Sequence, residues 1–202
     1  MNKRAETEYP VQELIAKRWS PRAMQERPVP HETLLSLLEA ARWAPSCFNA
    51  QPWSFLVATQ DQGEEFERMA GCLVEGNRGW ARRAPVLMLT VTRLTFEHNG
   101  KPNRHAWHDI GLAVGNLSLE ATARGLFLHQ MAGIDRDKAR ETYGIPEGHE
   151  AVTGIAIGYR ADPEVLPDAL RERELMPRSR KPLADFTFTG KWGERWNGVD
   201  GA

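Results

Sequence analysis

Two prolines, Pro45 and Pro52, constrain this chain more than any other feature of its sequence. They bracket a polar loop within the stretch 40–55, which reads AARWAPSCFNAQPWSF. Each proline fixes its own φ and biases the preceding residue away from the helical region, so Pro45 ends a helical pattern and Pro52 opens a strand. The hydroxyl and amide side chains between them suit a polar planar ligand, although an ordinary helix-to-strand connection has the same composition.

Hydrophobic periodicity predicts the other elements. We expect helices at 9–16, 31–43, 61–73 and 105–124, a helix from the Asp135 cap to Gly144, strands at 53–59, 84–92, 126–130 and 151–159, and a loop at 76–79. The strand at 84–92 is apolar enough to be covered on both faces. Helices alternate with strands but form few tight crossovers, which predicts an α+β sandwich with a mixed sheet.

The helix expected at 105–124 is apolar on two faces. Gly111, Gly115 and Ser118 form a stripe of small residues at helical spacing, which allows close approach of another helix. In a chain of 202 residues, part of that burial can come from a second subunit.

Size and composition predict one domain over 1–202, with a different character from about 161 onward. That last part is rich in proline and carries late aromatic rings, which need a surface on their own domain or on a partner. The formal net charge of -1 provides no global field for nucleic acid or an anionic membrane. We find no secretory signal and no apolar run long enough for a membrane span, and two cysteines suit a reducing compartment, so we expect a cytoplasmic protein.

Several residues could carry chemistry. Arg18, Ser20 and Arg22 alternate, so in an extended segment they would converge on one group; they fit a phosphate clamp or a solvated surface. Neither a dinucleotide-binding glycine fingerprint nor a P-loop is present, so a nicotinamide would be a transient substrate.

Cys47 with His108 could form a nucleophile and base, but the sequence favours a small buried thiol next to Trp43 or Phe48, because free cysteine is among the most buried residue types. His105 and His108 have no third ligand at clear spacing, so we expect no metal site. The basic run at 171–181 is interrupted by glutamates and makes a weak nucleic-acid patch, although a subset could reach a phosphate.

Taken together, the motifs resemble the nitroreductase family of FMN-dependent oxidoreductases. They are KRWSPR at 17–22, EAARWAPS at 39–46, NAQPW at 49–53, Asn77 before Ala84-Pro85, DIG at 109–111, ATARGL at 121–126, the segment 130–135 and RSRKPL at 178–183. They span nearly the whole chain in the family's order.

The resemblance implies a three-layer sandwich with a mainly antiparallel sheet, a homodimer with two FMN molecules at its interface, and an extended C-terminal arm. NADPH or NADH would deliver a hydride to flavin N5, and an electron-poor acceptor such as a nitroaromatic or quinone would then take it in a ping-pong scheme. No catalytic side chain is required, because the cofactor carries the chemistry. By position, the implied cofactor-binding residues are Arg18, Trp19, Ser20, Arg22, Pro45, Ser46, Cys47, Asn49, Asn77, Gln130, Met131, Ala132, Gly133, Arg178 and Arg180.

The implied roles differ along the chain. Arg18, Arg178 and Arg180 would hold the phosphate, and Arg22 would lie nearer the pyrimidine end of the ring. Pro45, Ser46, Cys47 and Asn49 would come from the other subunit; Asn77 would bond the pyrimidine edge or ribityl chain; and the 131–133 backbone would face N5.

One position departs from the family pattern. Where some relatives carry a lysine three residues after the Asn77 position, this chain has Trp80, so Arg22 alone would supply the cation near the reduced ring. Relatives with other reactions include reductive dehalogenases and flavin-fragmenting enzymes. A non-catalytic flavin-binding protein and a Cys47 hydrolase are the more distant alternatives.

Overall fold

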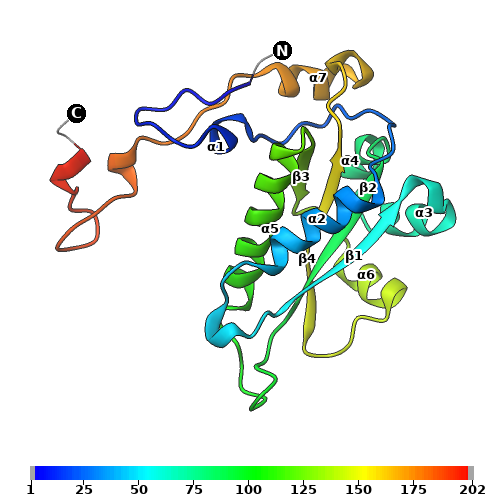
Figure 1. The fold of residues 1–202 in the computed structure, drawn as a ribbon, viewed down its shortest axis with the longest axis horizontal. Coiled ribbons are helices and arrows are strands. Elements are labelled where there is room, and N and C mark those ends of the chain that lie inside the picture. The colour runs from blue at the N-terminus through cyan, green and yellow to red at the C-terminus, as the bar shows by residue number, and fades with distance from the viewer. Residues whose placement is uncertain (1–2, 200–202) are drawn as a thin grey trace.

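A four-stranded sheet lies at the centre of the computed structural model, which describes residues 3–199 (Figure 1). Its strands are β1 (Trp53–Thr59), β2 (Val86–Arg93), β3 (Phe127–Met131) and β4 (His149–Gly158). They lie in the order β1-β2-β4-β3, and all three neighbouring pairs are antiparallel. The expected antiparallel character is confirmed, whereas the parallel pair of a mixed sheet does not occur within residues 3–199.

Helices cover both faces of this sheet. They are α1 (Glu13–Lys17), α2 (His31–Arg42), α3 (Glu64–Ala70), α4 (Glu75–Ala81), α5 (Ala106–Ala123), α6 (Arg136–Tyr143) and α7 (Asp168–Leu175). The predictions at 31–43 and 105–124 are confirmed to within two residues at each end. The expected three-layer α+β sandwich is therefore present.

Strand β2 shows why the molecule has three layers. Val86 and Met88 belong to a buried cluster with α2 and α5, whereas Leu87 and Leu89 belong to a second cluster with α3, α4 and α6. Successive side chains of a strand point to opposite faces, so an uninterrupted apolar run must be covered on both sides. Seven of the eight residues of β2 are buried, as its sequence predicted.

The prediction of a loop at 76–79 is wrong, because these residues form the middle of α4. Gly76 and Gly79 lower the helix propensity of this segment, but Trp80, which is 2% exposed, packs into the core and stabilises the helix. The helix expected at 61–73 is shorter than predicted, because Gly63 adopts φ 55° and separates a short 3-10 turn from α3.

Two further predictions need correction. The helix expected at 9–16 occupies only Glu13–Lys17, after Pro10 and an extended segment. Strand β1 was expected to be buried, but Ala58 is its only fully buried residue, because β1 lies at one edge of the sheet. Helix α6 follows its prediction: Asp135 accepts the Lys138 N–H at 2.9 Å, and Gly144 ends the helix with φ 59°.

Helix α5 buries one face and exposes the other. Ile110, Val114 and Leu117 are at most 2% exposed, whereas Trp107 is 42% exposed and Gly111 and Gly115 face outward. After α7 the chain runs away from the sheet toward the C-terminus, drawn in orange and red at the left of Figure 1. None of the helices within residues 3–199 is long and apolar enough to cross a membrane.

Candidate cofactor site

Arginines from both ends of the chain line one cavity of about 240 Å³. Six of the residues predicted from sequence lie there, namely Arg18, Trp19, Ser20, Arg22, Arg178 and Arg180. The five further residues of the wall were not assigned to the cofactor from sequence; they are Lys3, Arg173, Glu174, Met176 and Pro177. The structure thus brings together side chains that are up to 177 positions apart in the sequence (180 − 3).

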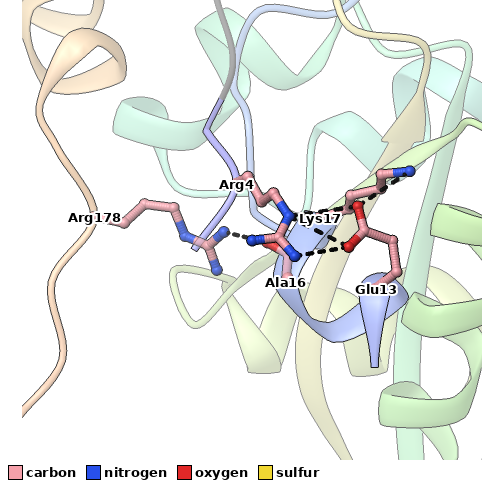
Figure 2. Close-up of polar contacts among 5 residues, drawn as sticks. All are labelled: Arg4, Glu13, Ala16, Lys17 and Arg178. Carbon is pink, nitrogen blue, oxygen red and sulfur yellow. Dashed lines mark hydrogen bonds and ion pairs between the residues drawn. The ribbon is translucent and has the colours of Figure 1, made fainter. Parts of the chain in front are cut away.

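Hydrogen bonds to the N-terminal segment fix the position of Arg178. Its guanidinium donates to the carbonyl of Ala16, at the end of α1, at 2.9 Å and to the carbonyl of Lys3 at 2.8 Å. Figure 2 shows Arg178 reaching across to Ala16, beside the ion pairs that Glu13 forms with Arg4 and Lys17. The segment after α7 is therefore attached to the start of the chain at the cavity.

A buried carboxylate fixes the other side of the cavity. Glu174 on α7 is 2% exposed, and its oxygens accept the backbone N–H of Arg22 at 3.0 and 3.1 Å and that of Ala23 at 3.3 Å. A buried carboxylate needs such donors, because loss of its hydration is costly. In the sequence, Glu174 lies within an alternating charge run, and no local signal distinguishes it from its exposed neighbours.

The cavity carries an excess of positive charge. Burial, and then the charge of Arg180, lower the pKa of Arg18; burial, and then the charges of Arg18 and Arg180, lower the pKa of Arg178. Within residues 3–199, none of these three guanidiniums forms an ion pair with a carboxylate. Clustered guanidiniums without a counter-ion fit a phosphate, which accepts several charge-assisted hydrogen bonds.

His129 supports the 18–22 segment from β3. Its Nδ1 lies 3.0 Å from the Pro21 carbonyl, to which the neutral ring donates. Burial, and then the charge of Arg22, lower the pKa of His129 to about 4. At neutral pH this histidine is therefore uncharged, and the cations of the cavity are the lysine and arginines alone.

Asn77 and the 131–133 segment also meet. The Asn77 side-chain amide donates to the Gly133 carbonyl at 3.0 Å. A Cβ at Gly133 would lie 2.6 Å from Asn77 Nδ2 and 2.7 Å from Val74 Cγ2, so this close approach requires glycine. Met131 is buried, whereas Ala132 and Gln130 are exposed.

The loop between the two prolines is held in an unusual conformation. Phe48, Asn49 and Gln51 have φ values of 52°, 53° and 46°, which non-glycine residues rarely adopt. Each such residue costs on the order of 1–3 kcal/mol and persists only where its surroundings impose it. Asp109, which is buried, accepts the Cys47 N–H at 3.1 Å, and Ser46 Oγ accepts the Gln51 N–H at 3.0 Å. Asp109 was not assigned this role from sequence.

The loop and the arginine cavity lie at opposite ends of α5. Asp109, which holds the loop, is in the first turn of α5, whereas Lys17 and Trp19 share a pocket with Thr122 and Ala123 in its last turn. Eighteen helical residues span about 27 Å. In Figure 1 the loop lies at the lower end of α5 and α1 at the upper end. A single chain therefore does not bring Pro45, Ser46, Cys47 and Asn49 to the other predicted residues.

This geometry gives little support to the alternative in which Cys47 is a nucleophile and His108 its base. His108 Nδ1 lies 3.3 Å from Asp109 Oδ1, so His108 pairs with Asp109 and not with the Cys47 thiol. Cys47 is partly exposed, and not the buried thiol that we considered. Residues 3–199 contain no cluster of three or more metal-ligating side chains.

Comparison with known proteins places the chain in a family. The sequence pattern of the nitroreductase family matches residues 15–159, which is more than half of the chain. The chain belongs to the nitroreductase family.

A solved structure described as an oxidoreductase containing FMN is 42% identical, with a TM-score of 0.90, and the match covers 96% of this chain and 98% of that one. An NADH dehydrogenase of Thermus thermophilus is 28% identical over 178 residues, which are 72% of this chain and 84% of that protein. Iodotyrosine deiodinase 1 of Rattus norvegicus is 25% identical over 186 residues, which are 79% of this chain and 65% of that protein.

Proposed function

We propose that this nitroreductase-family protein is an FMN-dependent NAD(P)H oxidoreductase that transfers a hydride to an electron-poor acceptor, such as a nitroaromatic or a quinone, by a ping-pong scheme. The observation that carries the proposal is the cavity in which Arg18, Arg178 and Arg180 gather, with no carboxylate of residues 3–199 paired to them. The name of the solved relative, which contains FMN, supports the same cofactor here.

The chain's own residues would bind and orient FMN. In this proposal, Arg18, Ser20, Arg178 and Arg180 hold the phosphate, and Trp19 closes the wall beside it. The amide of Asn77 and the backbone of 131–133, already joined through the Gly133 carbonyl, border the ring. When bound, the flavin supplies the redox chemistry, accepting a hydride from the nicotinamide and passing it to the acceptor.

We further propose that the working form is a homodimer. The cavity and the strained loop lie at opposite ends of α5, so two chains related by a two-fold axis could bring the loop of one to the cavity of the other. The open face of α5 and the exposed rings of Phe186, Trp192 and Trp196 provide apolar surface for such an interface. The segment from about 161 would then act as an arm that contacts the partner.

A second candidate keeps the fold and cofactor but changes the acceptor. The match to iodotyrosine deiodinase favours reductive removal of halide from a halogenated phenol. Two more distant alternatives, flavin fragmentation and flavin binding without turnover, use the same cavity.

One experiment separates these possibilities. The protein is purified, its visible spectrum recorded, and the bound flavin mixed anaerobically with NADPH or NADH in a stopped-flow instrument. We expect a yellow dimer whose flavin band is bleached by a nicotinamide and restored by a nitroaromatic or quinone, with FMN recovered intact. Restoration only by a halogenated phenol, with halide release, would identify the dehalogenase, and consumption of FMN the fragmenting enzyme. Absence of reduction by either nicotinamide would indicate a binding protein, and a colourless monomer that does not bind FMN would contradict the whole proposal.

A further inference from the structure

Trp80 and His129 form a tilted aromatic pair next to Arg22, which is one of the residues that line the arginine cavity. Trp80 on α4 is 2% exposed, and its ring centroid lies 4.6 Å from that of His129 on β3, at an interplanar angle of 52°. His129 is attached to the 18–22 segment through the Pro21 carbonyl. We call these two rings the aromatic support.

Arg22 is held at its backbone and lies over this support. Its backbone N–H donates to Glu174, and its guanidinium carbon lies 6.0 Å from the centre of the Trp80 ring. A guanidinium at this distance over an indole face is attracted by the ring quadrupole. Within residues 3–199 the Arg22 side chain forms no ion pair with a carboxylate, so its charge is not neutralised by a neighbour.

The aromatic support connects the cavity with the segment around Gly133. Arg22 lines the cavity together with Arg18 and Ser20. Trp80 belongs to the same helix as Asn77, whose amide donates to the Gly133 carbonyl, and His129 precedes Met131 on β3. Arg22 is therefore the cation of the cavity that packs against the elements bordering 131–133.

We infer that Trp80 and His129 are positioning residues, which hold the Arg22 guanidinium at the pyrimidine end of bound FMN so that Arg22 sets the reduction potential of the flavin. This inference rests on the proposed function. Reduced flavin carries negative charge over N1 and the C2 carbonyl, and a fixed cation there stabilises it relative to the oxidised form. A planar aromatic surface suits an arginine better than a lysine, because the guanidinium stacks on it.

The test is the midpoint potential of bound FMN, measured against a redox dye. Arg22→Gln is expected to reduce the preference for reduced over oxidised FMN about tenfold, which corresponds to a fall of about 30 mV for a two-electron couple. Trp80→Leu, which removes the aromatic face, is expected to give a fall of about half that size, and none when added to Arg22→Gln. Trp80→Phe keeps a ring face and should change the potential least.

Two variants keep the test decisive if Trp80→Leu does not fold. Arg22→Lys retains the charge without the stacking plane, so we expect a potential between those of the wild type and Arg22→Gln. Arg82→Gln removes an exposed arginine at the end of α4 that pairs with Glu67, and it should leave the potential unchanged.

The inference is overturned if Arg22→Gln has the wild-type potential, or if the effects of Arg22→Gln and Trp80→Leu add. Either result with a protein that binds FMN and is reduced by NAD(P)H contradicts this inference alone. A protein that does not bind FMN contradicts the proposed function instead.

Discussion

The arginine cavity and the strained loop are built in opposite ways. The cavity is assembled from distant parts of one chain, with Arg178 bound to Ala16 and Glu174 bound to Arg22, and it has unpaired positive charge. The loop is one short segment, held by its own Ser46 and by Asp109 of α5, and it exposes 81% of Phe48. The positive charge of the cavity suits an anion, whereas the exposed Phe48 ring of the loop suits an apolar surface. In the dimer that we propose, each chain would contribute the cavity of one site and the loop of the other, because the two lie at opposite ends of α5.

The largest effect is expected when the two halves of the proposed site are damaged in different chains. Arg18→Ala with Arg178→Ala damages the cavity, and Ser46→Ala with Asn49→Ala damages the loop. We expect each variant dimer to be inactive, but an equal mixture of reassembled subunits to recover about a quarter of wild-type activity, because half of the dimers would be mixed and each would have one undamaged site.

Isolating mixed dimers with two different affinity tags provides the control, and these should show about half of wild-type activity. Mixed dimers as inactive as both parents would mean that each site is built within one chain.

The next largest effect is expected from a single arginine of the cavity. Arg18→Ala should weaken FMN binding by about 1.5–3 kcal/mol, the size of a hydrogen bond to a charged group. A flavin fluorescence titration measures this change. Arg42→Ala, which removes an exposed arginine paired with Glu39 near the loop, should leave the affinity unaltered. Equal affinities for wild type and Arg18→Ala would show that Arg18 does not bind the phosphate.

Lowering the pH should reduce the free energy of unfolding through His129, which supports the 18–22 segment of the cavity. Its pKa is about 4 in the folded chain and near 6.5 when unfolded, so between these values the unfolded state binds more protons and stability falls as the pH falls. From pH 7 to pH 5 the wild type should lose about 2 kcal/mol more than His129→Gln. Urea unfolding at both pH values measures this difference, and parallel losses in the two proteins would exclude a buried neutral histidine.

The smallest effect is expected at the loop end. Asp109→Asn keeps the shape of the side chain but replaces the charged acceptor of the Cys47 N–H with a neutral one, at a cost of about 1 kcal/mol in the free energy of unfolding. Asp137→Asn on the exposed side of α6 is the matched control. If both variants unfold at the same urea concentration as the wild type, the carboxylate does not impose the loop conformation.

Local patterns in the sequence predicted most of the fold. The apolar run of β2, the amphipathic stripe of α2 and the Asp135 cap of α6 each follow from side-chain spacing over a few residues. Helix α4 was missed, because its glycines oppose helix formation and the compensating burial of Trp80 is a tertiary contact. Glu174 and Asp109 were missed for a related reason: nothing local shows that a carboxylate in a charged segment will be buried against distant backbone N–H groups.

Residue types at fixed spacing were enough to predict the family, the order of most helices and strands, and a set of candidate phosphate-binding residues. Three features became visible only in the folded molecule: Arg18 and Arg178 line one cavity, Trp80 lies beneath Arg22, and the loop lies at the far end of α5. Contacts between segments so far apart in the chain are set by how the layers pack and not by any local preference. Spacing alone therefore could not place the cavity and the loop relative to each other.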